Sequence, residues 1–147
     1  MRKMISFAVV ALLATSLSAQ TVANMKDLNA EKKSAAINLK LTGTLTTTRN
    51  SDFRQLRDLC WQLRTLDLSE ATCPVLPKNA FHSRHHLQSI ILPNQLQEIG
   101  SQAFFACDNL QEVVIPKSVT KVGAAAFSGC KALKNITIDG TPELGEF

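Results

Sequence analysis

Two kinds of side chain in this 147-residue sequence could do chemistry, namely four cysteines and three histidines. Paired thiols can form a disulfide or bind a metal, and neighbouring histidines can bind zinc when further ligands complete the site. The histidines fall within residues 82–86, whereas the cysteines are spread over 60–130. Their spacing decides which of these chemistries is open to them.

The histidines make a weak case for a metal site. His82 and His86 would share one face of a helix and His85 lies beside them, but no local carboxylate or repeated ligand completes the set. The sequence also has no G-x-S-x-G or H-E-x-x-H motif. We therefore predict no enzyme, no catalytic residue, no cofactor and no metal. A metal-dependent hydrolase that uses the His82 to His86 cluster is the least favoured alternative.

A repeat of 23 residues organises the chain. Ala-Phe recurs at 80–81, 103–104 and 126–127, and aliphatic residues recur at the same interval. Each copy carries L-x-x-L-x-L, the pattern of a strand whose alternate side chains point inward. One coil cannot bury its apolar side alone, so the coils must stack. Coils one to four begin their strand motif at Leu63, Leu87, Leu110 and Leu133, the first being one residue out of phase.

The repeat explains where the cysteines stand. Cys60, Cys107 and Cys130 each precede the first leucine of a coil by three residues, and Arg84 takes that place in coil two. Equivalent residues of adjacent coils lie about 4.8 Å apart with parallel side chains, slightly too far for an unstrained disulfide. We interpret these cysteines, and Cys73, as small buried hydrophobic residues. A Cys107–Cys130 disulfide stays open as the alternative, because export is oxidising.

The phrase A-F-x-x-C-x-x-L-x-x-[VI]-x-I, with "LPNQLQEIGSQAF" and "IPKSVTKVGAAAF" between coils, resembles the BspA-like, or type 5, leucine-rich repeats. The resemblance is specific over 76–138 and extends more weakly back to Leu39. The fold class expected is an α/β solenoid: a short right-handed array of about four 23-residue coils with a parallel sheet and an N-terminal strand–helix cap. The asparagine of the ordinary leucine-rich motif is missing, and its positions hold Ala71, Gln95, Ser118 and Thr141.

The first 19 residues have the composition of a secretory signal peptide. Arg2 and Lys3 precede an apolar run that is too short to span a membrane, and a small-residue close ends at Ala19. We predict an exported protein, secreted or held at the cell surface, without direct membrane insertion. The chain has 16 basic and 12 acidic residues, a balance too even to predict a nucleic-acid partner.

A cap is predicted ahead of the coils. Alternating apolar residues indicate a strand near 37–46, and Asn50 or Ser51 can begin a short helix. The apolar face of that helix consists of Phe53, Leu56 and Leu59. The predicted segments are a signal peptide at 1–19, a linker or frayed helix at 20–36, the cap at 37–60, and leucine-rich repeats at 61–147 with the last repeat incomplete.

The end of the sequence repeats one step of each coil without completing the next. Leu144-Gly145 matches Ile99-Gly100 and Val122-Gly123, and the sequence ends where another Ala-Phe would fall. Either the last coil leaves its end exposed, or the chain is part of a longer array, which we favour.

The residues between the inward aliphatics form the candidate partner-binding face, which we call the strand face. It comprises Arg64, Thr65, Asp67, Gln88, Ser89, Ile91, Gln111, Glu112, Val114, Lys134, Asn135 and Thr137. Stacking makes Ile91 and Val114 neighbours within a polar rim, which is the composition of a protein-binding patch. β-Branched residues are also favoured on any exposed sheet, so the pattern alone does not require a partner.

The sequence predicts an exported leucine-rich-repeat module that binds proteins through the strand face. The family resemblance implies adhesion to host, matrix or microbial surface proteins, with extracellular or surface proteins as partners. The alternative is a non-binding structural spacer, or a truncated fragment of a longer repeat protein.

Overall fold

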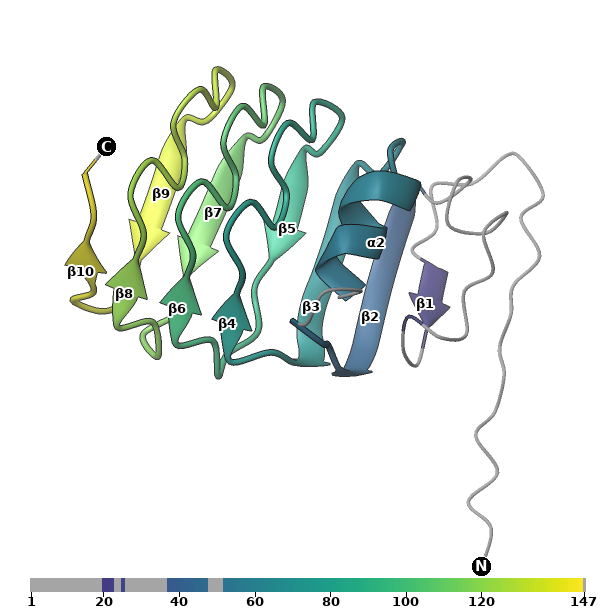
Figure 1. The fold of residues 1–147 in the computed structure, drawn as a ribbon, viewed down its shortest axis with the longest axis horizontal. Coiled ribbons are helices and arrows are strands. Elements are labelled where there is room, and N and C mark those ends of the chain that lie inside the picture. The colour runs from purple at the N-terminus through teal and green to yellow at the C-terminus, as the bar shows by residue number, and fades with distance from the viewer. Residues whose placement is uncertain (1–19, 23–24, 26–36, 48–51, 147) are drawn as a thin grey trace, which may run out of the picture.

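The computed structural model describes residues 20–22, 25, 37–47 and 52–146. In that part of the chain, successive coils stack along one axis, and the strands of each coil run side by side with those of its neighbours (Figure 1). The predicted signal peptide lies outside the described residues, as do Asn50 and Ser51, the predicted start of the cap helix.

The large sheet has six parallel strands in the order β1-β2-β3-β5-β7-β9. Their bounds are β1 (Gln20–Val22), β2 (Asn38–Thr44), β3 (Thr65–Thr72), β5 (Ser89–Ile91), β7 (Glu112–Ile115) and β9 (Asn135–Ile138). Leu66 pairs with Ile90, and Val113 pairs with Ile136, so the L-x-x-L-x-L motifs align from coil to coil. The predicted repeat and parallel sheet are confirmed.

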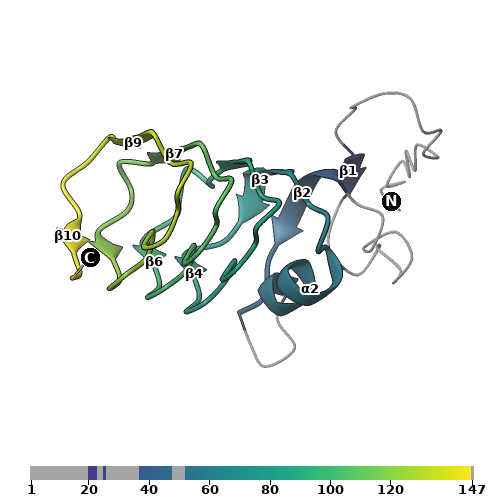
Figure 2. The ribbon, with the colours of Figure 1, turned by 90° about the horizontal axis from the view of Figure 1, so that it is seen from above.

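The return segments build a second, small parallel sheet in the order β10-β8-β6-β4. Its strands are β4 (Val75–Leu76), β6 (Glu98–Ile99), β8 (Lys121–Val122) and β10 (Glu143–Leu144). The two sheets form opposite walls of the solenoid (Figure 2).

The α/β description fits the structure only loosely. Among the described residues, one segment is an α-helix, α2 (Asp52–Leu59) in the cap, and no helix there is long and apolar enough to cross a membrane. The return segments are not helical because each contains tight turns. Non-glycine residues with positive φ recur before Ala-Phe, at Asn79, Gln102 and Ala125, which interrupts any helix.

Glycine is required where one return segment lies against the next. A Cβ built on Gly100 would be 2.6 Å from the backbone nitrogen of Lys78, and one on Gly123 would clash with the amide nitrogen of Ser101. The "IG" and "VG" steps seen in the sequence therefore set how closely the coils approach on the small-sheet side.

The space between the walls is filled by aliphatic residues and a column of phenylalanines. The ring centroids of Phe81 and Phe104 are 5.3 Å apart, and those of Phe104 and Phe127 are 5.1 Å apart. These separations are close to the spacing of parallel strands, as expected for one position repeated in each coil. Phe53 of α2 meets Phe81 edge-on at 5.9 Å, so the cap continues the column.

The cap follows the prediction except at two points. Phe53 and Leu56 are buried, but Leu59 is 39% exposed. In an α-helix, a side chain three residues further on points about 60° away from the first. Two such steps place Leu59 about 120° from Phe53, outside the buried face. The second point is 20–36, predicted as a linker or frayed helix. Gln20–Val22 instead forms the strand β1, which pairs in parallel with β2.

The opposite end of the core is open. Ile136, Ile138 and Leu144 are 40%, 41% and 47% exposed, although their counterparts in coil three are buried. They lack a following coil in this structure, so one side of each remains in contact with solvent.

Candidate functional site

The strand face lies on the outer surface of the large sheet, where backbone pairing arranges its residues in three rows. One row contains Thr65, Ser89, Glu112 and Asn135. The next contains Asp67, Ile91, Val114 and Thr137. In the third row, which holds Arg64, Gln88, Gln111 and Lys134, the amide of each later residue donates to the carbonyl of the one before. The structure therefore places all twelve residues on one surface.

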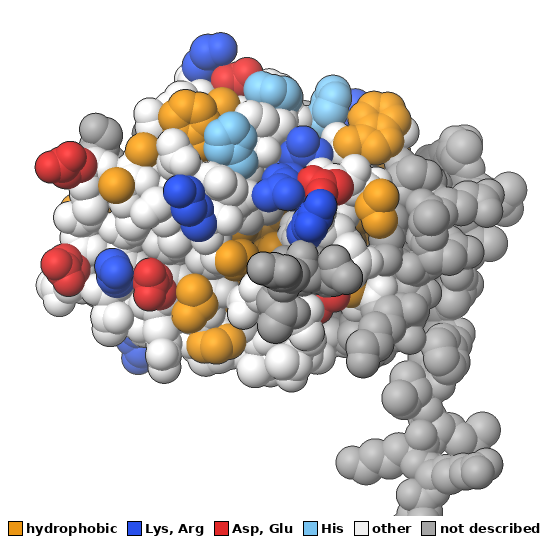
Figure 3. Space-filling model, in the orientation of Figure 1, with side chains coloured by type: hydrophobic (Ala, Val, Ile, Leu, Met, Phe, Trp, Pro, Cys, Tyr) orange, Lys and Arg blue, Asp and Glu red, His pale blue; other side chains and the backbone are white. Residues whose placement is uncertain are grey.

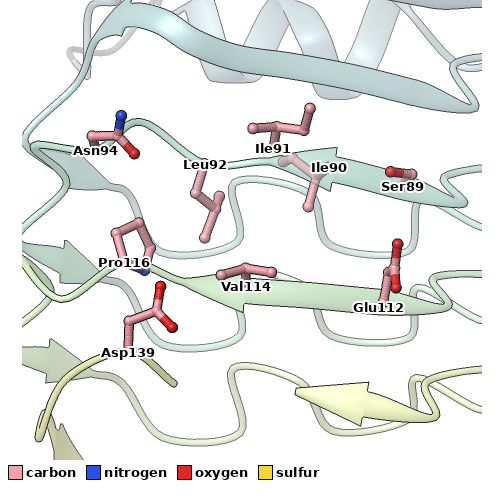
Figure 4. Close-up of a pocket in the computed structure, with 9 residues that line it drawn as sticks. All are labelled: Ser89, Ile90, Ile91, Leu92, Asn94, Glu112, Val114, Pro116 and Asp139. Atoms are coloured by element: carbon pink, nitrogen blue, oxygen red, sulfur yellow. The ribbon is translucent and has the colours of Figure 1, made fainter. Parts of the chain in front are cut away.

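A groove runs between β5 and β7 in the middle of this surface (Figure 4). Its volume is about 290 Å³. Ile91 and Val114, at its centre, are 52% and 51% exposed. Ser89 and Glu112 lie at one end, and Asn94, Pro116 and Asp139 lie at the other. Two half-exposed aliphatic side chains in adjacent coils thus form an apolar floor with polar groups at both ends.

The carboxylates of this wall differ in their partners. Asp67 lies 3.6 Å from the Lys40 ammonium, which also lies 2.7 Å from Glu70. Burial opposes ionisation of Asp67, but hydrogen bonds from Ser69 and the charge of Lys40 together lower the pKa of its carboxyl. Glu112 and Asp139 make no ion pair with any residue that the structure describes. The groove therefore has two carboxylates whose charge is not balanced by a contact.

Comparison with known proteins identifies the coils. Residues 75–145 match, in six copies, the family model described as BspA type leucine rich repeat region. These residues are a BspA-type leucine-rich repeat region. The family resemblance predicted from the Ala-Phe and cysteine pattern is confirmed for this segment. None of the curated proteins matches the chain.

A solved structure supports the same fold for most of the chain. A leucine-rich repeat protein from Bacteroides ovatus ATCC 8483 is 20% identical, with a TM-score of 0.51. The match covers 75% of this chain but 30% of that one, so this chain spans less than a third of its length. At this identity the likeness shows the fold alone. Leucine-rich repeats form protein-interaction modules, typically without catalytic chemistry.

The opposite wall of the BspA-type repeats offers a surface of another kind. Lys121 and Glu98, neighbours on the small sheet, form an ion pair of 3.6 Å. Figure 3 shows the side of the molecule that carries α2 and the small sheet, where charged and hydrophobic side chains are interspersed. A hollow on this side lies over α2 and is lined by Arg54, Gln55, Asp58 and Leu59, of which one side chain is aliphatic.

The three histidines contact different partners. His82 stacks on Phe105 with ring centroids 5.0 Å apart, and the Nδ1 of His85 lies 2.9 Å from an Asp108 oxygen. His86 packs edge-on against Trp61. They gather along one edge of the molecule (Figure 3), and the described residues contain no group of three or more side chains that could hold a metal.

None of the four cysteines forms a disulfide with another residue that the structure describes. The Sγ atoms of Cys107 and Cys130 donate to carbonyl oxygens of the preceding coil, 3.1 and 3.0 Å away. Burial raises the pKa of the Cys73 thiol to about 11, and the contact with Cys130 together with burial raises that of Cys107. Thiols with raised pKa values are poor nucleophiles, which agrees with a structural role for Cys73 and Cys107. The same contact between Cys107 and Cys130 lowers the pKa of the Cys130 thiol.

Arg84, which replaces the repeated cysteine in coil two, has a local explanation. The helix α2 precedes coil one, and the Arg84 guanidinium donates to the Arg57 carbonyl near the end of that helix. Helix C-terminal carbonyls lack intrahelical donors, and a cation is favourable beside them. Arg84 thus donates to a carbonyl of the cap, as Cys107 and Cys130 donate to carbonyls of the preceding coil.

Gln95 and Ser118 occupy two of the positions where the asparagine of the ordinary motif is absent. Gln95 donates to the Ala71 carbonyl at 2.7 Å, and Ser118 donates to the Leu96 carbonyl at 2.7 Å. Different side chains therefore still link adjacent coils at these positions of the BspA-type repeats.

Five residues that line the groove are not in the predicted strand face: Ile90 and Leu92, which the motif assigns to the core, and Asn94, Pro116 and Asp139. A signal for the last was present, because Asp139 directly follows the strand motif of coil four, where coils two and three have Pro93 and Pro116. A carboxylate that departs from the repeat is a stronger indication of function than one that follows it.

Proposed function

We propose that this chain is an exported protein-binding module whose strand face contacts extracellular or cell-surface proteins. The observation that supports it most is the exposed pair Ile91 and Val114, which are 52% and 51% exposed at the centre of the groove. Two neighbouring aliphatic residues kept in solvent contribute nothing to the core, whereas a partner that covers them gains the free energy of apolar burial.

Export rests on the signal-peptide composition of residues 1–19 and on the family, whose members are commonly secreted or surface proteins. The partner classes we propose are host, matrix and microbial surface proteins. Regular coils with a packed interior favour recognition on the outer surface over catalysis, because an active site needs a deep, water-excluding pocket.

The alternative is a structural spacer that binds no partner of its own. The open end of coil four favours it, because Ile136, Ile138 and Leu144 would be buried if further coils stacked there. A spacer would use the ends of the solenoid and leave the strand face without a ligand, so the two functions can be separated by experiment.

The test is capture of the purified chain on a panel of immobilised extracellular-matrix and cell-surface proteins, compared with the double variant Ile91→Glu plus Val114→Glu. We expect at least one protein to capture the chain and the variant to lose at least ten-fold in affinity, since two charges would be buried without partners.

The matched control is Gln97→Glu plus Thr120→Glu. These residues are exposed, stand in adjacent coils at the same interval of 23 residues, and lie beside the small sheet. The control adds the same charge and should leave capture unchanged. Absence of capture by every protein, or equal loss in both variants, would refute the proposed function.

A further inference from the structure

We infer that the groove between β5 and β7 binds an extended peptide segment in which an apolar residue is flanked, two positions away on each side, by lysine or arginine. This inference rests on the proposed function and names the chemistry of the partner. It follows from the apolar floor of the groove, the carboxylates at its two ends and the distance between them.

The floor requires an apolar residue in the middle of the partner segment. Ile91 on β5 and Val114 on β7 both line the groove, and Figure 4 shows Val114 along β7 and Ile91 on the side of β5 that faces β3. The volume of about 290 Å³ is at the lower limit for small-molecule sites and suits a side chain better than a whole ligand. An aliphatic residue laid over Ile91 and Val114 would remove apolar surface of all three side chains from water.

The ends of the groove require cations. Glu112 lies at one end on β7, and Asp139 lies at the other, after β9 (Figure 4). The amide of Asp139 donates to the Ile115 carbonyl at 3.0 Å, which places Asp139 beside Pro116. Neither carboxylate is paired within the described structure, and a lysine or arginine from a partner would supply that pair.

The carboxylate of Asp67, which lies outside the groove, has a partner within the chain. It stands in the same row as Ile91 and Val114, but Lys40 of the cap lies 3.6 Å from it. The cations of the strand face itself, Arg64 and Lys134, belong to a different row from Ile91 and Val114. Negative charge is therefore left unbalanced at the groove and balanced beside it.

The spacing of the charges selects an extended segment. Pro116 is four residues beyond Glu112 along β7, so the two ends are separated by about 13 Å at roughly 3.3 Å per residue. An extended peptide directs residues i, i+2 and i+4 to one face over the same length. Its central residue then meets Ile91 and Val114, while the cations at i and i+4 reach Glu112 and Asp139.

The test is fluorescence anisotropy of the purified full chain with labelled synthetic peptides, up to millimolar concentration. The probe is Gly-Lys-Thr-Ile-Thr-Lys-Gly. Gly-Glu-Thr-Ile-Thr-Glu-Gly reverses its charge, and Gly-Lys-Ile-Thr-Thr-Lys-Gly has its composition with the apolar residue moved to the other face. We expect the probe to bind at least ten-fold more tightly than either control peptide, and less tightly as salt is raised.

Variants of the chain test the assignment of each group. Glu112→Gln and Asp139→Asn should each weaken binding of the probe several-fold and reduce its salt dependence, whereas Glu98→Gln on the small sheet should change neither. Equal affinity for the probe and the peptide with the shifted isoleucine would overturn the inference.

The failure of this inference differs from failure of the proposed function. If no peptide binds but the protein panel captures the chain through Ile91 and Val114, the peptide chemistry is wrong and the proposed function stands. If the probe binds equally to the chain with Ile91→Glu and Val114→Glu, the groove is not its site and the inference is overturned, while the protein panel still decides the proposed function.

Discussion

The two walls of the solenoid come from the same coils and present different surfaces. On the large sheet, Ile91 and Val114 stand in solvent between two unpaired carboxylates. On the small sheet, each strand has two residues, and the outward charges of Glu98 and Lys121 pair with each other. The difference indicates that the charges on one wall of a repeated fold can pair with each other, while those on the other wall stay available to a partner.

The walls also differ in what limits the approach of successive coils. Behind the large sheet, inward side chains such as Ile115 fill the core. On the small-sheet side, backbone contacts at Gly100 and Gly123 limit how closely successive coils can approach. Substitutions outside the core should therefore be tolerated on the large-sheet wall and tolerated least at the glycines of the other. The predictions below test this contrast in order of decreasing effect.

The largest effect is expected within a single strand of the large sheet. Ile115→Ala should lower the free energy of unfolding by about 2–5 kcal/mol, because it empties a buried site. Val114→Ala, at the adjacent outward position, should change it by less than about 1 kcal/mol. Urea unfolding of the two variants measures the difference, and equal losses would show that Val114 is not an outward residue.

The second effect concerns the small-sheet wall. Gly123→Ala should destabilise the chain by about 2–3 kcal/mol, since the new Cβ would clash with the Ser101 backbone. Gly140→Ala is the control, because its Cβ would be 3.1 Å from the nearest atom, the Lys117 carbonyl oxygen. Thermal unfolding should rank Gly123→Ala well below Gly140→Ala; the reverse order would contradict backbone-limited stacking on this wall.

The smallest effect lies in the turns that join the walls. Ala106 has a φ of 55°, and the equivalent residue of coil four is Gly129, with a φ of 77°. Ala106→Gly should stabilise the chain by about 0.5–1 kcal/mol, because glycine adopts this conformation without the steric cost of a Cβ. Calorimetry can detect the gain, and a loss of stability would mean that the Ala106 methyl group contributes packing that outweighs its strain.

Much of the fold could be predicted from the sequence because it depends on a local period. Ala-Phe and L-x-x-L-x-L recur at one interval. Stacking of the coils then determines which side chains face inward and which residues of neighbouring strands pair with each other. The loose fit of the α/β class comes from the return segments, where two-residue strands have no periodic signal of their own. The prediction for Leu59 is wrong because residues three apart do not stay on one face of a helix with 3.6 residues per turn.

The candidate site could be predicted only in part. Alternation along the strands indicates that Ile91 and Val114 face outward, and the structure places them side by side. The groove also depends on Asp139, which follows its strand. The charge beside the groove depends on Lys40, which comes from the cap and forms an ion pair with Asp67. These contacts join elements that are distant in sequence, so the strand motif does not reveal them, although Asp139 departs visibly from the prolines of coils two and three.

The most direct test of the strand face as the interaction surface is methyl NMR of the chain with a protein from the panel that captures it. The methyl signals of Ile91 and Val114 should shift or broaden when the partner is added. Those of Val75, half-buried on the small sheet, should not change. Perturbation of Val75 with unchanged Ile91 and Val114 would place the interaction on the other wall and contradict the account.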